Sequence, residues 1–576
     1  MINHLFHRGP PDLVSAIRNG WIHGRPRRGR RGARRVVLGL VTALSGSLVA
    51  GGLAWAALGV DTNAVSDDVA GVEDTTSPRR NQPEPAIAIN PQNTQIIAAG
   101  AQDFRRAAEL RAACGGDRWN GLYLSTDGGS TWSNELVPGY CTDTSPEAAD
   151  SEMFGLSTNT DPVLVFDDFG NLYYSHIAFN NDPFRTVPPS TSGVLFVSTY
   201  EVDATGAEHV QTVKVPSGSG LRPERFEVGP GIFANFDDKQ WMAVDRSPAS
   251  PHWGRVYVTW TKFSAQGGES SIWISHCGGD VSGEACADDE FSRGHGINNP
   301  VAGGLVQESF PTVAPNGDVY VAFLQFQGGF GSTLPHSGVW VAKSTDGGET
   351  FTQQKVADIR QIPSPIPPGG THANDGNNSF RTGTIPTIGV TGDGTVHLAW
   401  GEWTGTDAEV KYVRSIDGGL TWTAPVSMND VPTGHQFFPS LTTDGDNVHV
   451  IWYDSRLNGP AGTTIEDLDV FYNRSADAGA TFQADVRMTD RSFDPNEVSR
   501  FPVFCAAFIG DYVDIDAVNG KVAAIWNDNR NVVDPLTPAE CDDFQPRSTE
   551  PTIQADLDDG SLDQEAFVDV FDIPTP

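Results

Sequence analysis

The sequence predicts an all-β protein, a β-propeller of seven four-stranded blades preceded by one N-terminal hydrophobic segment, with six blades as the alternative. Three observations lead to this fold class. A glycine-rich turn motif occurs four times, a pair of short apolar strands recurs seven times, and no convincing amphipathic helix separates the copies. The 576 residues include 62 Gly and 39 Pro, which is typical of a turn-rich globular chain.

The N-terminal arm differs in charge from the rest of the chain. Residues 1–60 contain nine Arg and a single acid, Asp12, and carry +8, so residues 61–576 hold −43 of the total of −35. Residues 36–60 are uncharged and long enough to cross a bilayer, and the arginines before them favour a cytoplasmic N-terminal end. We expect an Arg-rich cytoplasmic or signal n-region at 1–35 and either a transmembrane anchor or a signal peptide at 36–60.

The remainder of the chain is therefore expected to be exported, to the cell surface or the extracellular space. Its strongly acidic balance argues against nucleic acid as a partner, because a phosphate-binding surface needs an excess of cations. Contact with the membrane is expected only through the N-terminal segment. We expect a monomer.

All six cysteines follow the hydrophobic segment, as suits an oxidising compartment. Fifteen connectivities are possible, and neighbours in sequence form three local pairs. We predict disulfides 114–141, 277–286 and 505–541. No C-x-x-C motif supports a metal site instead.

Four eight-residue segments share the turn motif, and each follows an alternating apolar run. They are 125–132 (STDGGSTW), 344–351 (STDGGETF), 415–422 (SIDGGLTW) and 475–482 (SADAGATF). The Asp can accept backbone hydrogen bonds, the glycines allow positive φ, and the aromatic residue anchors the hairpin to the core. The motif therefore predicts a turn at a strand end.

The second pattern is an apolar strand, often opened by Pro, followed by a short turn and an aromatic-ended strand. Its seven copies begin at residues 84, 161, 240, 310, 385, 438 and 511. We expect the last copy to lack a fourth strand of its own, because residues 567–571 resemble a third strand and only five residues follow. We expect residues 61–79, otherwise a linker, to supply that strand and close the ring.

The turn motif resembles the Asp box (BNR repeat) of sialidases and their relatives, and its repeat frame covers nearly all of residues 80–576. The resemblance implies a sialidase-like β-propeller over this range. Asp boxes also occur in propellers that hydrolyse nothing, the seven copies differ from the six blades usual in sialidases, and the F-R-I-P motif of that family is absent. Whether this chain is an enzyme is left open by the sequence.

The Asp boxes mark one face of such a propeller, so function is expected on the opposite face, where first strands start and second strands end. Arginines there can bind a carboxylate through paired hydrogen bonds. If the sialidase resemblance extends to the site, the arginine triad is Arg80, Arg381 and Arg500. The acid/base residue is then Asp103, and Tyr512 is the nucleophile, assisted by Glu402 or Glu308.

A W-x-D-x-R pattern also repeats at two second-strand ends. The two copies contain the pairs Asp454 and Arg456, and Asp528 and Arg530. These pairs are either substrate-binding groups or salt bridges that tie strands together.

The resemblance implies an exo-sialidase-type glycoside hydrolase that acts on terminal acidic sugars of glycans. The alternative is a non-catalytic extracellular propeller that binds glycan or protein on the same face. No cofactor is required by either reading. A structural calcium ion between loops is compatible with the many oxygen ligands, although no complete calcium loop occurs.

Overall fold

In the computed structural model, the described residues are 62–63, 82–116, 118–179, 193–216, 236–263, 270–286, 291–297, 305–327, 337–369, 377–458, 462–497, 507–531 and 563–573. The predicted N-terminal regions 1–35 and 36–60 lie outside these residues. Within the described part of the chain, no helix is long and apolar enough to cross a bilayer. The described helices are α1 (Ala107–Cys114) and the short 3-10 helix η2 (Pro146–Asp150).

The strands form seven four-stranded antiparallel sheets, so the predicted seven-bladed arrangement is confirmed. The first four sheets, in chain order from the innermost strand outward, are as follows. Blade 1 has β2 (Ala86–Ile89), β3 (Ile97–Asp103), β4 (Trp119–Ser125) and β5 (Ser133–Leu136). Blade 2 has β6 (Thr158–Phe166), β7 (Asn171–Phe179), β8 (Val194–Asp203) and β9 (Gly206–Lys214). Blade 3 has β10 (Phe236–Val244), β11 (Val256–Phe263), β12 (Ser270–Cys277) and β13 (His295–Ile297). Blade 4 has β14 (Leu305–Val313), β15 (Val319–Phe326), β16 (Ser337–Ser344) and β17 (Thr352–Ile359).

The last three sheets follow the same order. Blade 5 has β18 (Pro386–Val390), β19 (Val396–Trp403), β20 (Ala408–Ser415) and β21 (Val426–Ser427). Blade 6 has β22 (Gln436–Asp444), β23 (Asn447–Asp454), β24 (Asp469–Ser475) and β25 (Val486–Arg487). Blade 7 has β26 (Asp514–Val518), β27 (Lys521–Asn531), β28 (Asp563–Asp572) and β1 (Thr62–Asn63).

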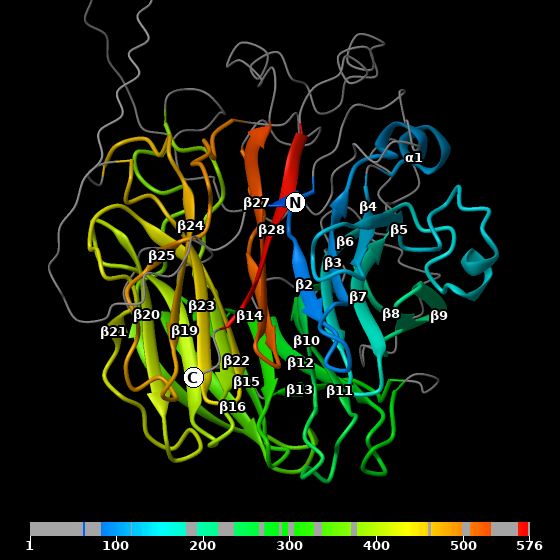
Figure 1. Ribbon diagram of the computed structural model, residues 1–576, viewed down its shortest axis with the longest axis horizontal. Helices are drawn as coiled ribbons and strands as arrows, with labels where there is room; N and C mark the ends of the chain where they lie inside the picture. The colour runs from blue at the N-terminus through cyan, green and yellow to red at the C-terminus, as the bar shows by residue number, and fades with distance from the viewer. Residues whose placement is uncertain are drawn as a thin grey trace, which may run out of the picture. The chain divides into compact units, whose positions relative to one another are not determined.

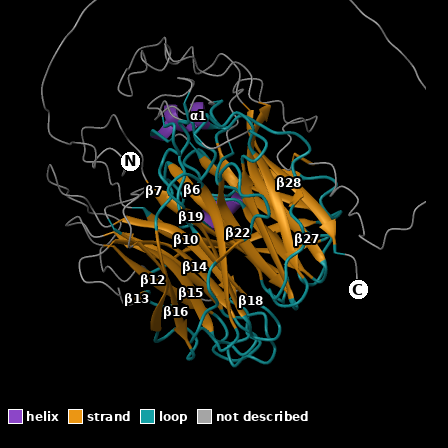
Figure 2. Ribbon diagram, turned by 90° about the vertical axis from the view of Figure 1, so that its left-hand side faces the viewer, coloured by secondary structure: helices purple, strands orange, loops and turns teal. Residues whose placement is uncertain are grey.

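The innermost strands close a ring. Each of β2, β6, β10, β14, β18, β22 and β26 contacts the innermost strands of the two neighbouring blades, and β26 contacts β2. The C-terminal strand β27, orange in Figure 1, accordingly contacts the blue β2, and the red β28 pairs with β27. Figure 2 shows that strands and loops make up nearly all of the described chain.

Blade 7 joins the two ends of the described chain. Its outermost strand, β1, comes from the segment between residues 61 and 80 and pairs with β28 through Thr62 and Val568 and through Asn63 and Phe567. Two aspartates strengthen the junction with blade 1, since Asp514 and Asp516 accept the backbone N–H groups of Ile87 (3.0 Å) and Ile89 (2.8 Å). The two carboxylates thus accept hydrogen bonds from backbone N–H groups at the open edge of β2, where a neighbouring strand would otherwise accept them.

The Asp boxes form the turns between the third and fourth strands of blades 1, 4, 5 and 6. In the box of blade 4, Asp346 accepts hydrogen bonds from the backbone N–H of Thr350 (2.9 Å) and its hydroxyl (2.6 Å), while Ser344 accepts from Gly348 N–H (2.9 Å). The same bonds recur in the other three boxes.

Three boxes also bind the preceding blade through a cation. Arg255 donates to the carbonyl of Gly347 (3.0 Å), and Arg414 donates to that of Ala478 (2.8 Å). Lys343 makes the equivalent bond to Gly418 (3.2 Å). The described contacts of the motif are therefore structural.

Replacing Ala478 with glycine is expected to stabilise the fold. Ala478 has a φ of 49° where the other boxes have Gly128, Gly347 and Gly418 at 71° to 73°. The left-handed conformation costs a residue with a Cβ about 1 kcal/mol, so Ala478→Gly should raise the free energy of unfolding by up to that amount in denaturant titration. Gly418→Ala is the matched control and should lower it. A loss of stability in Ala478→Gly would contradict this reading of the turn.

Aromatic side chains on the second strands fill the spaces between blades. Trp260, Trp400, Trp452 and Trp526 are fully buried, as the aromatic-ended strands of the repeat suggested. Two cysteine pairs are confirmed as disulfides, Cys114 with Cys141 and Cys277 with Cys286. The third predicted pair, 505–541, lies outside the described residues.

Three buried histidines make the fold sensitive to acid. Burial lowers the pKa of His176, His397 and His449 to about 3, against about 6.5 in an unfolded chain. The unfolded state therefore binds more protons between these values, and stability present above pH 6.5 is lost as the pH falls toward 3. In His397→Gln, the melting temperature should depend less steeply on pH over this range. An unchanged slope would show that His397 does not contribute.

Candidate functional site

The site begins with a kink shared by the innermost strands. Beta-bulges interrupt β6, β10, β14 and β22 near their starts. Five non-glycine residues at the equivalent position of different blades have positive φ: Glu84 (59°), Asp161 (53°), Lys239 (51°), Glu308 (60°) and Phe438 (51°). Strand pairing places Ile385 and Tyr512 at this position in the other two blades. We call these seven residues, one from each blade, the axial ring.

This backbone conformation is costly for residues that carry a Cβ, about 1 to 3 kcal/mol each, and such strain concentrates at functional sites. The repeated bulge places strongly polar residues at the start of strands that are otherwise apolar and buried. The axial ring is therefore the first candidate for a functional site on the face opposite the Asp boxes.

Lys239 is the centre of the charged part of the ring. Its Nζ lies 3.3 Å from Glu84 Oε1 and 4.0 Å from Asp161 Oδ2, and it also forms an ion pair with Asp511. Burial alone would lower the pKa of Lys239, but the charges of Asp511, Glu84 and Asp161 outweigh burial and hold the pKa above its usual value. The ammonium group is thus positively charged at neutral pH and fully engaged.

Arg381 joins the same cluster from the segment that precedes β18. Its guanidinium pairs with Asp511, lies 3.7 Å from Glu84 Oε1 and stands 4.7 Å from the ring of Phe508. Burial raises the pKa of Asp511, but Arg381 and Lys239 lower it by more, so its net pKa is below the usual value. Asp511 therefore remains ionised, held between two cations.

Glu308 has the opposite electrostatic setting. It is only 5% exposed, and burial raises its pKa to about 8 in spite of the attraction of Lys239. Burial and the charge of Asp161 likewise raise the pKa of Asp238 to about 6 and that of Glu84 well above its usual value. The cluster thus combines a carboxyl that is protonated at neutral pH with a carboxylate that is ionised, the kind of pairing used in acid–base catalysis.

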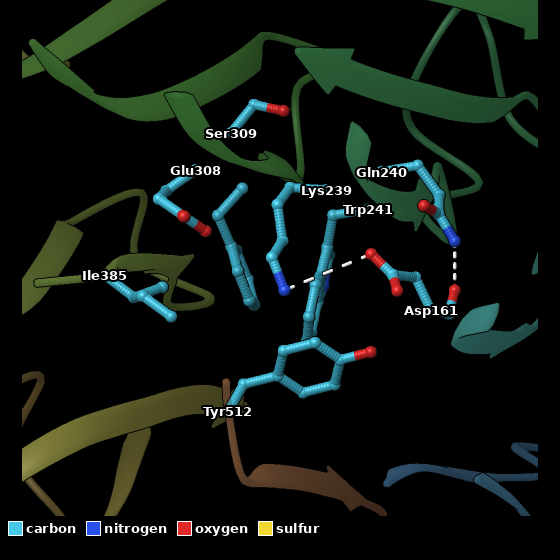
Figure 3. A pocket seen from close by; sticks show the side chains of 9 residues that line it. Asp161, Lys239, Gln240, Trp241, Glu308, Ser309, Ile385 and Tyr512 are labelled. Carbon is cyan, nitrogen blue, oxygen red and sulfur yellow. Dashed lines mark hydrogen bonds and ion pairs between the residues drawn. The ribbon is translucent and has the colours of Figure 1, made fainter. Parts of the chain in front are cut away.

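A small pocket lies beside these groups (Figure 3), and the roughly 330 Å³ of empty space in and around it includes open solvent. Its lining residues are Asp161, Lys239, Gln240, Trp241, Glu308, Ser309, Phe310, Ile385 and Tyr512. Figure 3 shows Lys239 between Glu308 and Asp161, with Tyr512 at the side of the pocket formed by blade 7.

Aromatic rings form one wall of the pocket. Trp241 stacks on Phe310 with ring centroids 4.5 Å apart and meets Tyr512 edge to face at 5.2 Å. The Tyr512 hydroxyl donates to the carbonyl oxygen of Pro162 (3.2 Å), and burial raises its pKa well above the usual value. An apolar wall with a few polar groups opposite is the usual composition of a small-molecule site.

The structure brings some of the predicted site residues together. Glu308 and Tyr512 line the same pocket, and Arg381 lies in the adjoining charge cluster. Glu402 does not line this pocket; it accepts a hydrogen bond from Trp400 Nε1 (3.4 Å) on β19. Arg80 and Arg500 lie outside the described residues.

The Asp–Arg pairs at second-strand ends are engaged with their own blades. Asp454 binds both the backbone N–H (2.8 Å) and the guanidinium (2.7 Å) of Arg456, whose face covers Phe471 at 4.0 Å. Asp528 with Arg530, and Asp103 with Arg105, repeat these bonds, and Asp103 also accepts from Tyr123. None of these pairs is among the residues that line the pocket.

Sequence reasoning missed Glu84, Lys239 and Gln240 as site residues. The only available signal was position, because each lies next to the start of the apolar strand of its repeat. Lys239 directly follows two aspartates, Asp237 and Asp238. In the structure Asp237 and Asp238 are largely buried, and Asp238 accepts a hydrogen bond from Gln307 (3.1 Å).

Among the described residues, no group of three or more His, Cys, Asp or Glu side chains is placed to hold a metal ion. The cluster around Lys239 is organised by its ammonium group. Calcium binding between loops therefore remains a prediction.

Comparison with known proteins gives remote structural matches only. No family model and no curated protein matches the chain. The Hadza microbial sialidase Hz136 is similar with a TM-score of 0.39 and 14% identity, over 71% of each chain. A Trypanosoma rangeli sialidase, solved as a covalent intermediate, has a TM-score of 0.34 and 11% identity over 69% of this chain and 56% of its own. The polysaccharide lyase Uly1 has a TM-score of 0.39 and 10% identity over 83% and 88%. The propeller assignment rests on the sheet topology described above.

Proposed function

We propose that the chain is an exported, sialidase-like glycoside hydrolase that cleaves a terminal sugar from a glycan in the axial pocket. The observation that carries the proposal is the position of Glu308, a buried carboxyl with a pKa of about 8, in one pocket with Asp161 and an aromatic wall. Glycosidic bond cleavage needs a protonated acid on one side of the bond and an anionic group on the other.

In this scheme Glu308 is the general acid, which protonates the leaving oxygen. Asp161, on the other side of Lys239 in Figure 3, faces the developing positive charge of the sugar. Tyr512 remains the candidate nucleophile of the sialidase-like alternative. That role requires its hydrogen bond to Pro162 to break and its proton to leave.

Specificity for an acidic sugar is a separate part of the proposal. It depends on Arg80 and Arg500 joining Arg381, because Arg381 is already paired with Asp511 and close to Glu84. Three arginines around a single carboxylate would then bind the acid group of the sugar.

A non-catalytic propeller that binds a glycan or an extracellular protein is the second candidate. The hydrogen bond that occupies the Tyr512 hydroxyl, together with the pairing of both cations, favours it. Such a protein would bind sugars in the same pocket without cleaving them.

The test is an assay of the purified full-length protein on a fluorogenic sialoside and on fluorogenic neutral hexosides. The proposal predicts turnover of at least one of them. Arg381→Ala should reduce turnover of the sialoside selectively, with Arg381→Lys retaining part of it, provided that both variants melt as the wild type does. Turnover of none, with binding retained, would support the non-catalytic alternative. Sialoside turnover unaffected by Arg381→Ala would remove Arg381 from the site.

A further inference from the structure

Two residues that line the pocket each have a buried polar atom with no hydrogen-bond partner among the described residues: the amide oxygen of Gln240 and the hydroxyl of Ser309. Gln240 is 2% exposed and Ser309 is 3% exposed. Leaving a buried polar atom unpaired is destabilising, because the atom loses the hydrogen bonds that water would otherwise provide. Such atoms in a native structure call for an explanation, and a ligand that completes their hydrogen bonds is one.

The two residues occupy equivalent places on adjacent blades. Gln240 follows Lys239 of the axial ring, and Ser309 follows Glu308. Blades 1, 2, 5 and 6 have proline at this place: Pro85, Pro162, Pro386 and Pro439. The strand therefore does not need a polar residue here, and only blades 3 and 4, whose innermost strands line the pocket, carry one with a hydrogen-bonding side chain.

The orientation of Gln240 fixes what it can bind. Its amide nitrogen donates to the backbone oxygen of Asp161, as the dashed line in Figure 3 shows, so the amide oxygen is turned away from that bond. This oxygen can only accept a hydrogen bond, whereas the Ser309 hydroxyl can donate or accept.

We infer that Gln240 and Ser309 form a subsite that hydrogen-bonds the hydroxyl groups of the sugar ring bound in the axial pocket. This inference rests on the proposed glycan function and adds to it the part of the sugar that is recognised. A hydroxyl group can donate to Gln240 and accept from Ser309. A carboxylate, sulfate or phosphate has no donor for Gln240.

The surroundings fit the same ligand. The carboxylates of Asp161, Glu84 and Asp511 surround Lys239 and engage its charge, so this part of the pocket presents no unpaired cation among the described residues to an anion. Trp241 and Phe310 supply the apolar surface on which the C–H face of a sugar ring can rest. The uncharged, hydroxyl-bearing side of the sugar therefore faces blades 3 and 4.

The test uses calorimetry and ligand-detected NMR to measure how the full-length protein binds four methyl glycosides, those of glucose, galactose, mannose and sialic acid. At least one is expected to bind, and Ser309→Ala and Gln240→Met should each weaken it by about tenfold or more, a loss of about 1.4 kcal/mol. Free Ser309→Ala should melt at or above the wild-type temperature, because the hydroxyl it removes is unpaired in the free protein.

Ser270→Ala is the matched control, since Ser270 is an equally buried serine whose hydroxyl bonds both the carbonyl (2.6 Å) and the N–H (2.7 Å) of Val306. It should lower the melting temperature and leave glycoside affinity unchanged.

The following results would overturn the subsite. One is wild-type affinity in both Ser309→Ala and Gln240→Met, and another is a melting temperature of free Ser309→Ala that falls as far as that of Ser270→Ala. If glycoside turnover is normal in these variants, the subsite fails and the proposed function stands. If binding depends on them and turnover is absent, the subsite stands and the catalytic proposal fails. No binding by the wild type overturns both.

Discussion

Replacing Lys239 with methionine should destabilise the propeller by about 3 to 5 kcal/mol. The side chain is 11% exposed, and its ammonium group balances Glu84, Asp161 and Asp511. Methionine keeps most of the volume but leaves these buried carboxyl groups without their common cation, so they must either repel one another or take up protons. Chemical denaturation at pH 7 measures the loss. Because protonation removes the repulsion, the loss should be smaller at pH 5.

Two variants separate this electrostatic effect from lost packing. Lys239→Met combined with Asp511→Asn should recover part of the stability, because the second change removes one of the uncompensated charges. Lys355→Met is the matched control: its partner Asp358 is 58% exposed, and a change within about 0.5 kcal/mol is expected. A loss below about 1 kcal/mol in Lys239→Met would mean that the cluster is not organised around this ammonium group.

Glu308→Gln should reduce glycoside turnover by about 100-fold to 10,000-fold, the range expected for loss of a general acid. Glutamine has nearly the same shape but carries no acidic proton. The reduction should be smaller for a substrate whose leaving group needs no protonation. For the wild type, a pKa of about 8 predicts a rate that falls as the pH rises above 8, where Glu308 loses its proton.

Stability provides the control for this variant. The raised pKa of Glu308 means that the folded state binds an extra proton between about pH 4.5, its usual value, and pH 8, so the stability associated with that proton is lost as the pH rises through 8. Glu308→Gln is uncharged throughout and should melt no lower than the wild type at pH 9. Glu409→Gln, which changes a carboxylate on the third strand of blade 5 that is paired with Lys411, should leave turnover unchanged. Full activity in Glu308→Gln, together with loss of activity in Glu402→Gln, would mean that Glu402 of blade 5 is the general acid instead of Glu308.

The repeated parts of this protein could be predicted from the sequence because each is specified locally. An Asp box such as 344–351 contains both the donors and the acceptors of its turn. Tryptophans at 260, 400, 452 and 526 mark the buried ends of four of the second strands. Cys277 and Cys286 are separated by only nine residues, so their pairing also follows from proximity.

The site could be predicted only in part, because it exists only after the ring closes. Glu84, Lys239 and Asp511 are separated by 155 and 272 residues along the chain, yet they form one charge cluster. Lys239 itself has the left-handed backbone conformation of the bulge, so no glycine or asparagine in the sequence indicates that conformation. Tyr512 and Glu308 were identified through the expected face and the family resemblance, whereas Gln240 and Ser309 become visible only when the equivalent prolines of the other blades are aligned.

The measurement that tests the central claim most directly is a crystal structure of the full-length protein with a non-hydrolysable glycoside of the sugar that binds best. The account predicts that the sugar ring rests on Trp241, with its glycosidic oxygen within hydrogen-bond distance of Glu308 and a hydroxyl bonded to Gln240 or Ser309. A sugar bound on the Asp-box face, or at a site that contacts none of these residues, would contradict it.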